Sequence, residues 1–253
     1  MSVKIIDVLI PATLRPDVLN ETLASFRRNM MPCYGPVPSE RYYRAWINID
    51  PVGMEGVSQR TMIRTLGHSF PGFSYRIPDQ PHFGRAFRWL WTRPVGDYVL
   101  YLEDDWVLDA PIDLENMIWI LDVEPDLAVL RLPWRPTGLD SMKNWKFSFP
   151  WSGRYFECPV DARREVGFCG HPSLIRGDFV RAIGPLLDPE RNPEKQFHHG
   201  SESMMAEIDR WRYGVFGQPN QPAAIRDIGR AWMARQGLAK AGSKAFFTEW
   251  ERI

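Results

Sequence analysis

The sequence carries no net charge and is poor in lysine. Its 31 basic and 31 acidic side chains balance to a formal net charge of +0. This balance counts against a strongly basic nucleic-acid-binding surface over the whole molecule, while a local basic groove stays open. Arginine supplies most of the positive charge and suits bidentate phosphate contacts, although a GC-rich genome gives the same bias. Lysine occurs only at positions 4, 143, 146, 195, 240 and 244.

Cysteine is scarce as well. Cys33, Cys158 and Cys169 form no metal-like pair spacing and suggest no disulfide framework, so we expect a reducing, cytoplasmic setting. The first residues enter a strand-like run without the basic flank and long apolar core of a signal peptide. No apolar run approaches the length of a membrane-spanning helix, and we expect a soluble protein.

Apolar residues are present in ordinary amount, and tryptophan is unusually frequent. A hydrophobic content of 44% over 253 residues allows a sizeable core in one large domain or two small ones. The eleven tryptophans could fill that core. They could equally serve as stacking platforms for sugars and bases.

Three consecutive carboxylates, Glu103, Asp104 and Asp105, follow an apolar and aromatic run of strand length. A packed core does not tolerate three adjacent unpaired carboxylates, because each carries a heavy desolvation cost. Open α/β sheets bind ligands beyond the carboxyl ends of their strands, and Mg²⁺ uses one or two carboxylates together with phosphate oxygens. The pattern predicts a metal–diphosphate site; the alternative is a solvated acidic turn.

Strands and helices alternate over the first half of the chain, which predicts a mainly parallel sheet flanked by helices. Asp50 ends the second strand, where it can hydrogen-bond a ribose or base, or lie in a solvated turn. Gly84 would let the backbone approach a ligand, and the helix that starts at Arg85 would favour an anion. Strands are expected at 3–10, 44–49, 73–77, 97–102 and 128–132. Helices are expected at 17–28 with Asp17 as N-cap, and at 57–66, 85–91 and 112–123.

The chain changes character after residue 132. Residues 133–161 hold many aromatics among Pro, Gly and Ser, and predict an antiparallel ribbon or long loops. That region is either an acceptor-binding wall or a second small core patch. Further along we expect a glycine-rich strand at 166–175, a helix at 178–183, a polar loop at 186–200, a helix from Ser201 to a C′ glycine at Gly214, a short strand at 215–216 and a basic amphipathic tail to residue 244.

Together these residues resemble a family 2-type glycosyltransferase with the GT-A fold, over roughly residues 1–215. Segments 10–16 and 19–26 look like the family's first strand, nucleotide loop and helix, and 83–86 and 98–105 continue the match. Within 98–105, Glu103 and Asp105 around Asp104 meet the acid–any–acid metal motif. The similarity ends with Gly170 before an antiparallel stretch, and with Glu202 one short helix before Gly214.

The resemblance implies an α/β, GT-A-type (Rossmann-like) fold: a mainly parallel central sheet flanked by helices, with a small antiparallel, loop-rich acceptor region. One domain, 1–253, would comprise a nucleotide-sugar-binding half at 1–132, an acceptor-side half at 133–220 and a C-terminal segment at 221–253 that closes on the site. The implied reaction moves a sugar from a nucleotide-diphosphate sugar, with a UDP-sugar expected, to a hydroxyl acceptor, with inversion.

Residue roles follow from the same resemblance. Glu103 and Asp105 would hold Mn²⁺ or Mg²⁺ on the diphosphate. His198 or His199 is a candidate third metal ligand or diphosphate contact; the alternative is that these histidines are structural or solvated. Glu202 is the expected general base; a first-turn glutamate favoured by the helix dipole is the alternative. The family usually has an acidic pair there, whereas this chain has Ser-Glu-Ser. Donor contacts are expected from Pro11, Thr13, Arg15, Asp50, Gly84, Arg85, Glu103, Asp104 and Arg230. With Asp227, Arg230 would either close over the diphosphate or form a surface ion pair.

Two other classes stay open. Sugar-phosphate nucleotidyltransferases have a similar nucleotide-binding sheet, but that family carries a lysine near the N-terminus, and this chain has no lysine between residues 5 and 142. A non-catalytic, Trp-rich module that binds sugar or nucleic acid fits the aromatic loops, but leaves the strand that ends in three acids unexplained.

The acceptor stays open among a glycan, a protein side chain, a small metabolite and a hydroxylated base in DNA. Compact glycosyltransferases of this kind occur in phages that decorate their DNA or virions, and a phage enzyme would act in the host cytoplasm. DNA binding would need a local groove, for which the candidates are Arg131, Arg135, Arg154, Arg163 and Arg164.

Overall fold

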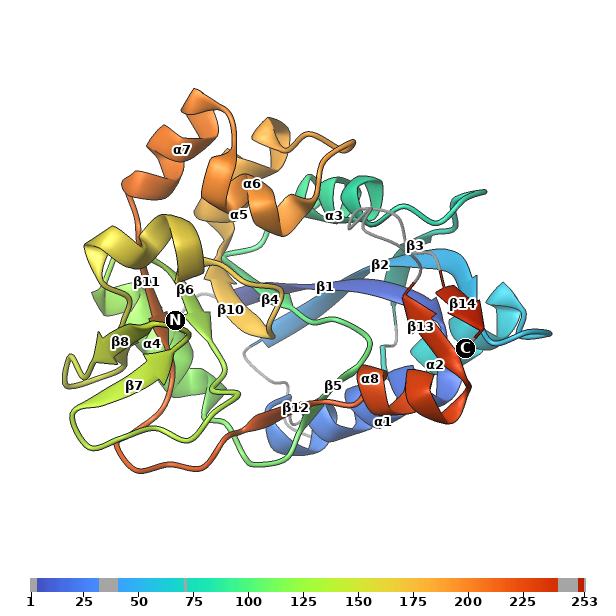
Figure 1. Cartoon of the computed structure of the whole chain (residues 1–253), viewed down its shortest axis with the longest axis horizontal. Coiled ribbons are helices and arrows are strands. Elements are labelled where there is room, and N and C mark those ends of the chain that lie inside the picture. The colour runs from blue at the N-terminus through green and yellow to red at the C-terminus, as the bar shows by residue number, and fades with distance from the viewer. Residues whose placement is uncertain (1–3, 32–40, 71, 241–249, 253) are drawn as a thin grey trace.

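The computed structural model describes residues 4–31, 41–70, 72–240 and 250–252. An eight-stranded sheet lies at its centre, with the strand order β3-β2-β1-β4-β10-β6-β11-β9 (Figure 1). Neighbours among β1 to β4 are parallel, as are β6 and β11, whereas β10 runs antiparallel between β4 and β6. The expected mainly parallel sheet is confirmed. Its strands are β1 (Lys4–Leu14), β2 (Arg41–Gly53), β3 (Phe73–Arg76), β4 (Tyr98–Tyr101), β6 (Leu127–Arg131), β9 (Phe156–Glu157), β10 (Ser173–Arg176) and β11 (Arg212–Val215).

Helices cover both faces of this sheet (Figure 1). Alternate residues of β1 point to opposite faces, so Val8 and Ile10 enter one core cluster and Leu9 enters another. On the first face lie α1 (Pro16–Asn29), α2 (Gln59–Gly67) and α4 (Leu114–Val123). On the second face lie α3 (Phe83–Trp91), α5 (Gly177–Ile183), α6 (Pro193–His199) and α7 (Glu202–Asp209). No helix of the described residues is long and apolar enough to cross a membrane.

Three two-stranded antiparallel sheets accompany the main sheet. The hairpin of β7 (Ser141–Asn144) and β8 (Phe147–Pro150) is the antiparallel ribbon expected between 133 and 161. The other pairs are β5 (Trp106–Leu108) with β12 (Ile225–Asp227), and β13 (Leu238–Lys240) with β14 (Trp250–Arg252).

Two boundaries in the first half differ from expectation. β1 continues to Leu14 because its parallel pairing with β2 extends that far, so Pro11 and Thr13 lie in a strand and not in a loop. Asp17 is not the N-cap of α1: Arg15 takes that position, and Pro16 supplies the fixed φ of the first helical residue.

The elements of the second half of the chain differ more from those expected. The expected strand at 166–175 is reduced to β10, after a 3₁₀ turn (Val160–Ala162) and a π-helical turn (Arg163–Gly167). The expected polar loop at 186–200 contains α6, after a 3₁₀ turn at Gly184–Leu186. Ser201 does cap α7, but the helix ends at Asp209. Gly214 is not its C′ residue: it lies in β11, packed against the Tyr155 ring. Cys33 and the basic tail after residue 240 lie outside the described residues.

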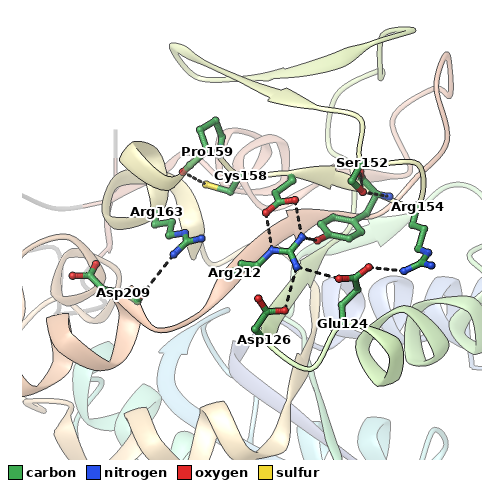
Figure 2. Close-up of polar contacts among 11 residues, drawn as sticks. Glu124, Asp126, Ser152, Arg154, Cys158, Pro159, Arg163, Asp209 and Arg212 are labelled. Atoms are coloured by element: carbon green, nitrogen blue, oxygen red, sulfur yellow. Dashed lines mark hydrogen bonds and ion pairs between the residues drawn. The ribbon is translucent and has the colours of Figure 1, made fainter.

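β11 is fixed to its neighbours through Arg212 (Figure 2). The guanidinium donates to both oxygens of Glu157 at 2.7 and 2.8 Å, and to Tyr155 Oη at 2.6 Å. It also reaches Glu124 at 3.0 Å and Asp126 at 3.1 Å, at the end of α4 and in the turn before β6. One arginine thus joins β9, β11 and the α4–β6 turn.

The C-terminal segment returns to the middle of the molecule. β12 pairs with β5, the strand directly after the three acids, with Asp227 opposite Trp106. α8 (Gly229–Arg235) follows at once and packs through Trp232 and Met233 into a small third cluster with Val18 and Val107. The last part of the chain therefore helps to build the region around the acids.

Candidate functional site

Asp104 is the buried member of the three acids. It follows the end of β4 and is 4% exposed. One of its oxygens accepts from the Thr13 backbone N–H at 2.9 Å and from the Thr13 hydroxyl at 3.0 Å. The other accepts from Arg15 Nη2 at 2.5 Å. Asp104 therefore ties the end of β1 to the acidic turn.

Arg15 lies between two acids and two tryptophans. The same Nη2 atom lies 3.1 Å from Asp105 Oδ2, and the guanidinium carbon lies 5.6 Å from the Trp232 ring and 5.3 Å from the Trp250 ring. The expected contacts of Thr13 and Arg15 with a nucleoside stay a prediction; in the structure both residues donate to Asp104, and Arg15 also donates to Asp105. These buried acids need donors, and β1 brings both residues within reach.

Asp105 is crowded by negative charge. Burial and the charge of Asp104, with a smaller effect of Asp227, raise the pKa of Asp105 to about 6, although Arg15 opposes the shift. α8 closes one side: the Ile228 N–H donates to the Asp105 carbonyl at 2.9 Å, and a side chain on Gly229 would collide with the Asp105 carboxylate. A cation beside Asp105 would relieve this crowding.

Glu103 faces a fourth carboxylate, Glu194. The Tyr101 hydroxyl donates to Glu103 Oε1 at 3.0 Å, and the Gly170 N–H donates to Glu194 Oε1 at 2.7 Å. A Cβ atom on Gly170 would lie 2.7 Å from the Glu103 oxygen and 2.9 Å from the Glu194 oxygen. Burial and the charges of Glu103, Glu194 and Asp105 raise the pKa of Tyr101 well above its usual value. We call Glu103, Asp104, Asp105 and Glu194 the carboxylate cluster.

Glu194 is the residue that the sequence analysis missed, because it lies in the expected loop. It stands in the first turn of α6, which Asn192 caps by accepting from the Lys195 N–H. The local sequence Asn192-Pro193-Glu194 held the signal. An N-cap asparagine, a proline at the first helical position and an acid in the first turn are typical of a helix start.

The other expected acid lies outside this cluster, whereas His198 stands one turn after Glu194 on α6, close enough for the two charges to interact. Glu202 is exposed at the start of α7, and no hydrogen bond or ion pair of the described residues joins it to the cluster. Figure 1 places α7 far from α8. His198 and His199 end α6, and burial and the neighbouring His199 lower the pKa of His198. Among residues 4–31, 41–70, 72–240 and 250–252, no group of three His, Cys, Asp or Glu side chains could hold a metal by itself. The roles expected of His198 and His199 stay predictions.

A polar cavity of about 350 Å³ lies near the carboxyl ends of β2 and β3. Asp50 lines it, accepting from Asn48 Nδ2 at 2.8 Å and from the His82 N–H at 3.2 Å. Arg85, at the start of α3, also lines it and pairs with Glu190 at 2.7 Å. The complete lining is Asn48, Asp50, Arg76, Ile77, Pro78, Asp79, Gln80, His82, Arg85 and Ala86.

Gly84 and Arg230 both make contacts within the protein. Gly84 is packed against the backbone carbonyls of Pro189 and Arg191, so its small size serves the contact with the loop before α6. Arg230 is exposed and forms an ion pair with Asp227 at 3.5 Å, the surface-pair alternative of the sequence analysis.

The arginine groove expected for DNA is not formed by the described residues. Arg154 pairs with Glu124 at 2.5 Å, and Arg163 donates to the Asp209 carbonyl at 3.2 Å (Figure 2). Arg164 pairs with the Asp209 carboxylate, and Arg131 is buried. Nearby acids and carbonyls thus engage Arg154, Arg163 and Arg164, whereas Arg135 lies over the Trp134 ring at 4.0 Å.

No protein-family model and no curated protein sequence matches the chain. Solved structures do. TarS 1-349 of S. aureus in complex with UDP aligns at 12% identity with a TM-score of 0.55, over 86% of this chain and 59% of TarS 1-349. The mannosyltransferase PcManGT of Pyrobaculum calidifontis, in complex with GDP-Man and Mn²⁺, aligns at 11% identity with a TM-score of 0.51, over 92% of this chain and 60% of that chain.

The chain has a GT-A fold. That fold agrees with the resemblance given by the strand, nucleotide-loop and acid segments. The chain spans less than two thirds of these neighbours, and 36% of the longer TarS chain. In this GT-A sheet, the carboxylate cluster lies beyond the end of β4, as open α/β sheets place their ligand sites.

Proposed function

We propose that the protein transfers a sugar from a nucleotide-diphosphate sugar to a hydroxyl acceptor. The observation that carries this proposal is the carboxylate cluster at the strand ends of a GT-A sheet that also holds a polar cavity. Structural neighbours bound to UDP, to UDP-GlcNAc, and to GDP-Man with Mn²⁺ support it. The TarS complexes favour a UDP-sugar as donor.

The cavity beside β2 and β3 is the proposed nucleoside site. Asp50 and Asn48 line it and offer acceptors for base or ribose donors, and Asn48 Oδ1 is buried without a partner among the described residues. Arg85 at its rim, at the start of α3, is proposed to face the donor phosphates. Pro11, in β1, and Arg230, beside Asp227, remain proposed donor contacts.

The carboxylate cluster fits a divalent cation shared with the donor. Glu103 and Asp105 would hold Mn²⁺ or Mg²⁺ together with diphosphate oxygens, the arrangement that uses only one or two protein carboxylates. Burial and the neighbouring charge of Asp104 raise the pKa of Asp105, and such a cation would offset that charge. When bound, the ion neutralises charge on the departing nucleoside diphosphate.

Glu194 is the general base that we propose in place of Glu202. Its carboxylate is held by the Gly170 N–H and faces Glu103. In the proposed reaction the acceptor oxygen attacks the anomeric carbon, the bond from that carbon to the diphosphate breaks, and Glu194 takes the hydroxyl proton. A single displacement of this kind inverts the anomeric centre.

Donor binding tests the proposal directly. We expect one nucleotide or nucleotide sugar to raise the melting temperature of the protein only when Mn²⁺ or Mg²⁺ is present. Asp105→Ala should abolish this response while leaving the fold intact. Asp109→Ala is the matched control, because Asp109 is an exposed acid just beyond β5 that pairs with Arg226. An unchanged response in Asp105→Ala would remove the metal assignment, and no response in the unmodified protein would remove the donor site.

A further inference from the structure

Arg131 is buried at the carboxyl end of β6 without an acidic partner among the described residues. It is 1% exposed, and its Nη1 atom donates to Cys169 Sγ at 2.9 Å. Its Nε and Nη2 atoms are sealed from solvent and have no acceptor. A guanidinium stays charged and carries five donors, so burying it unpaired is strongly unfavourable.

The groups around Arg131 supply no counter-charge. Burial raises the pKa of Cys169 and raises that of Cys158 to about 12, so both thiols stay protonated at neutral pH. Burial and the charges of Arg131 and Arg135 lower the pKa of His171 to about 3, so its imidazole is neutral. The Phe149 ring, 5.5 Å from the guanidinium carbon, offsets only part of the cost.

More donors without acceptors lie near the same position. Trp134 Nε1 and Asn144 Nδ2 are buried and unpaired within the described parts of the chain. The Trp134 ring lies 5.3 Å from the His171 ring, and the Arg135 guanidinium lies 4.0 Å from the Trp134 ring. Asn144 is on the buried face of the β7–β8 hairpin that also presents Phe149 to Arg131. Because buried polar groups are normally paired, several unpaired donors together indicate a missing acceptor.

We infer that Arg131, Arg135 and these donors bind an oxyanion, a phosphate or a carboxylate, and that the hydroxyl acceptor carries it. Cys169, which accepts from Arg131, directly precedes Gly170, whose N–H holds Glu194. An anionic group at Arg131 therefore brings the rest of the acceptor close to the proposed base. The acceptor assignment rests on the proposed function, whereas the anion site itself does not.

The β7–β8 hairpin covers Arg131 with the Phe149 ring. It pairs only with itself as a two-stranded sheet, and one bridge from Trp151 to Phe156 connects its base to β9. Its tip holds Trp145 with φ 55, a conformation that costs a non-glycine residue energy. An anion reaches the guanidinium only if the hairpin moves, because Met142 and Phe149 on its inner face are buried in the core and Lys146 at its tip pairs with Glu165 at 2.8 Å.

Sulfate is a suitable probe, with sodium chloride of matched ionic strength as the reference. Sulfate stabilises proteins in general, so the response of Arg131→Met sets the baseline. We expect a saturable rise of roughly 5 °C or more in the melting temperature of the unmodified protein at sulfate concentrations far above the dissociation constant. Arg131→Met should lose that rise and, without sulfate, should melt at the same or a higher temperature, because it no longer buries an unpaired charge. Arg154→Met, which removes an arginine already paired with Glu124, should keep the full response.

The opposite pattern overturns the inference. If Arg131→Met melts lower and keeps the sulfate response, Arg131 has only a structural role. If that variant does not fold, Arg135→Gln carries the test: a weakened sulfate response supports the site, and an unchanged response overturns it.

Nucleoside diphosphate with Mn²⁺ identifies the source of the anion. Additive effects of sulfate and nucleotide support an acceptor group at Arg131, whereas displacement of the sulfate effect by nucleotide assigns the site to the donor and overturns the acceptor assignment. A nucleotide response without any sulfate response would leave the proposed function standing and remove this site.

Discussion

Asp7 and Asp104 lie at opposite ends of β1, and donors surround each of them. Asp7 is fully buried, pairs with Arg44 at 2.6 and 2.9 Å, and accepts from the N–H groups of Val95 and Gly96. Burial alone would raise the pKa of Asp7, but the hydrogen bonds from Arg44, Gly96 and Trp46 outweigh it and hold that pKa below its ordinary value. These two acids serve the fold.

Because the pKa of Asp7 is lower in the folded state, the free energy of unfolding falls as the pH is lowered. The contribution of Asp7 is fully present above its unfolded pKa near 3.8 and is lost as the pH falls through the lower folded value. We expect Asp7→Asn to reduce the free energy of unfolding by about 2–4 kcal/mol at pH 7, and by much less at pH 3. Urea unfolding at both pH values measures this. Asp97→Asn, which alters an exposed acid that accepts from the Ile5 N–H, should cost little at either pH, and an equal cost of Asp7→Asn at both would contradict the assignment.

Glu194 and Glu202 each stand in the first turn of a helix, and only Glu194 belongs to the carboxylate cluster. Once an acceptor is known, Glu194→Gln should lower the transfer rate by roughly 10²–10⁴-fold, because it removes the proton acceptor while keeping the shape. Donor-induced stabilisation should survive. Glu202→Gln should leave the rate within about twofold of the unmodified protein, and the reverse order of effects would return the base to α7.

β11 is the strand most dependent on a single side chain. Arg212 contacts three carboxylates and a phenol from β9, the α4 end and the turn before β6 (Figure 2). Arg212→Met removes the arginine that Glu157 and Tyr155 share, while Glu124 keeps its ion pair with Arg154. We expect a loss of about 2–4 kcal/mol in the free energy of unfolding. Arg210→Met, two residues earlier and pairing with Glu207 on the surface, should cost less than about 1 kcal/mol. Equal midpoints of the two variants in urea would show that the Arg212 contacts add nothing to stability.

At the scale of elements, the sequence predicted those parts of the fold that local patterns determine. β1, β2 and β4 are apolar runs, and α1, α2 and α4 show an apolar face, so their positions were recognisable within a few residues. The bounds of β10 were not recognisable. The strand is only four residues long, and tertiary pairing determines its antiparallel position between β4 and β6. α6 was hidden because prolines and polar residues dominate the segment before it.

In the candidate site, too, the sequence predicted what local patterns determine and missed what tertiary contacts determine. The acids after β4 follow from a strand end and lie in the cluster. Asp50 lines the cavity, but it lies within β2, because that strand continues to Gly53 and does not end at Asp50. The role of Thr13 and Arg15 as partners of Asp104, and the approach of Glu194 to Glu103, depend on segments separated by about ninety residues. No local spacing encodes such contacts.

On the scale of the whole molecule, the boundary expected at residue 132 does not divide the sheet. β9, β10 and β11 come from the later half, yet β10 lies between β4 and β6 of the earlier half. The arrangement joins both halves across the carboxylate cluster, since Gly170, just before β10, contacts Glu103, just after β4. Donor and acceptor sides of the proposed reaction therefore share one rigid sheet.

The pairing of β12 with β5, followed by Gly229 against Asp105, has a consequence for the order of synthesis. When the chain has emerged from the ribosome only as far as β11, every strand of the main sheet is outside the exit tunnel, but the segment that walls in Asp105 is not. The nascent protein can thus build its scaffold before its site is enclosed. The proposed reaction therefore depends on residues 225–235 having left the exit tunnel and packed beside Asp105.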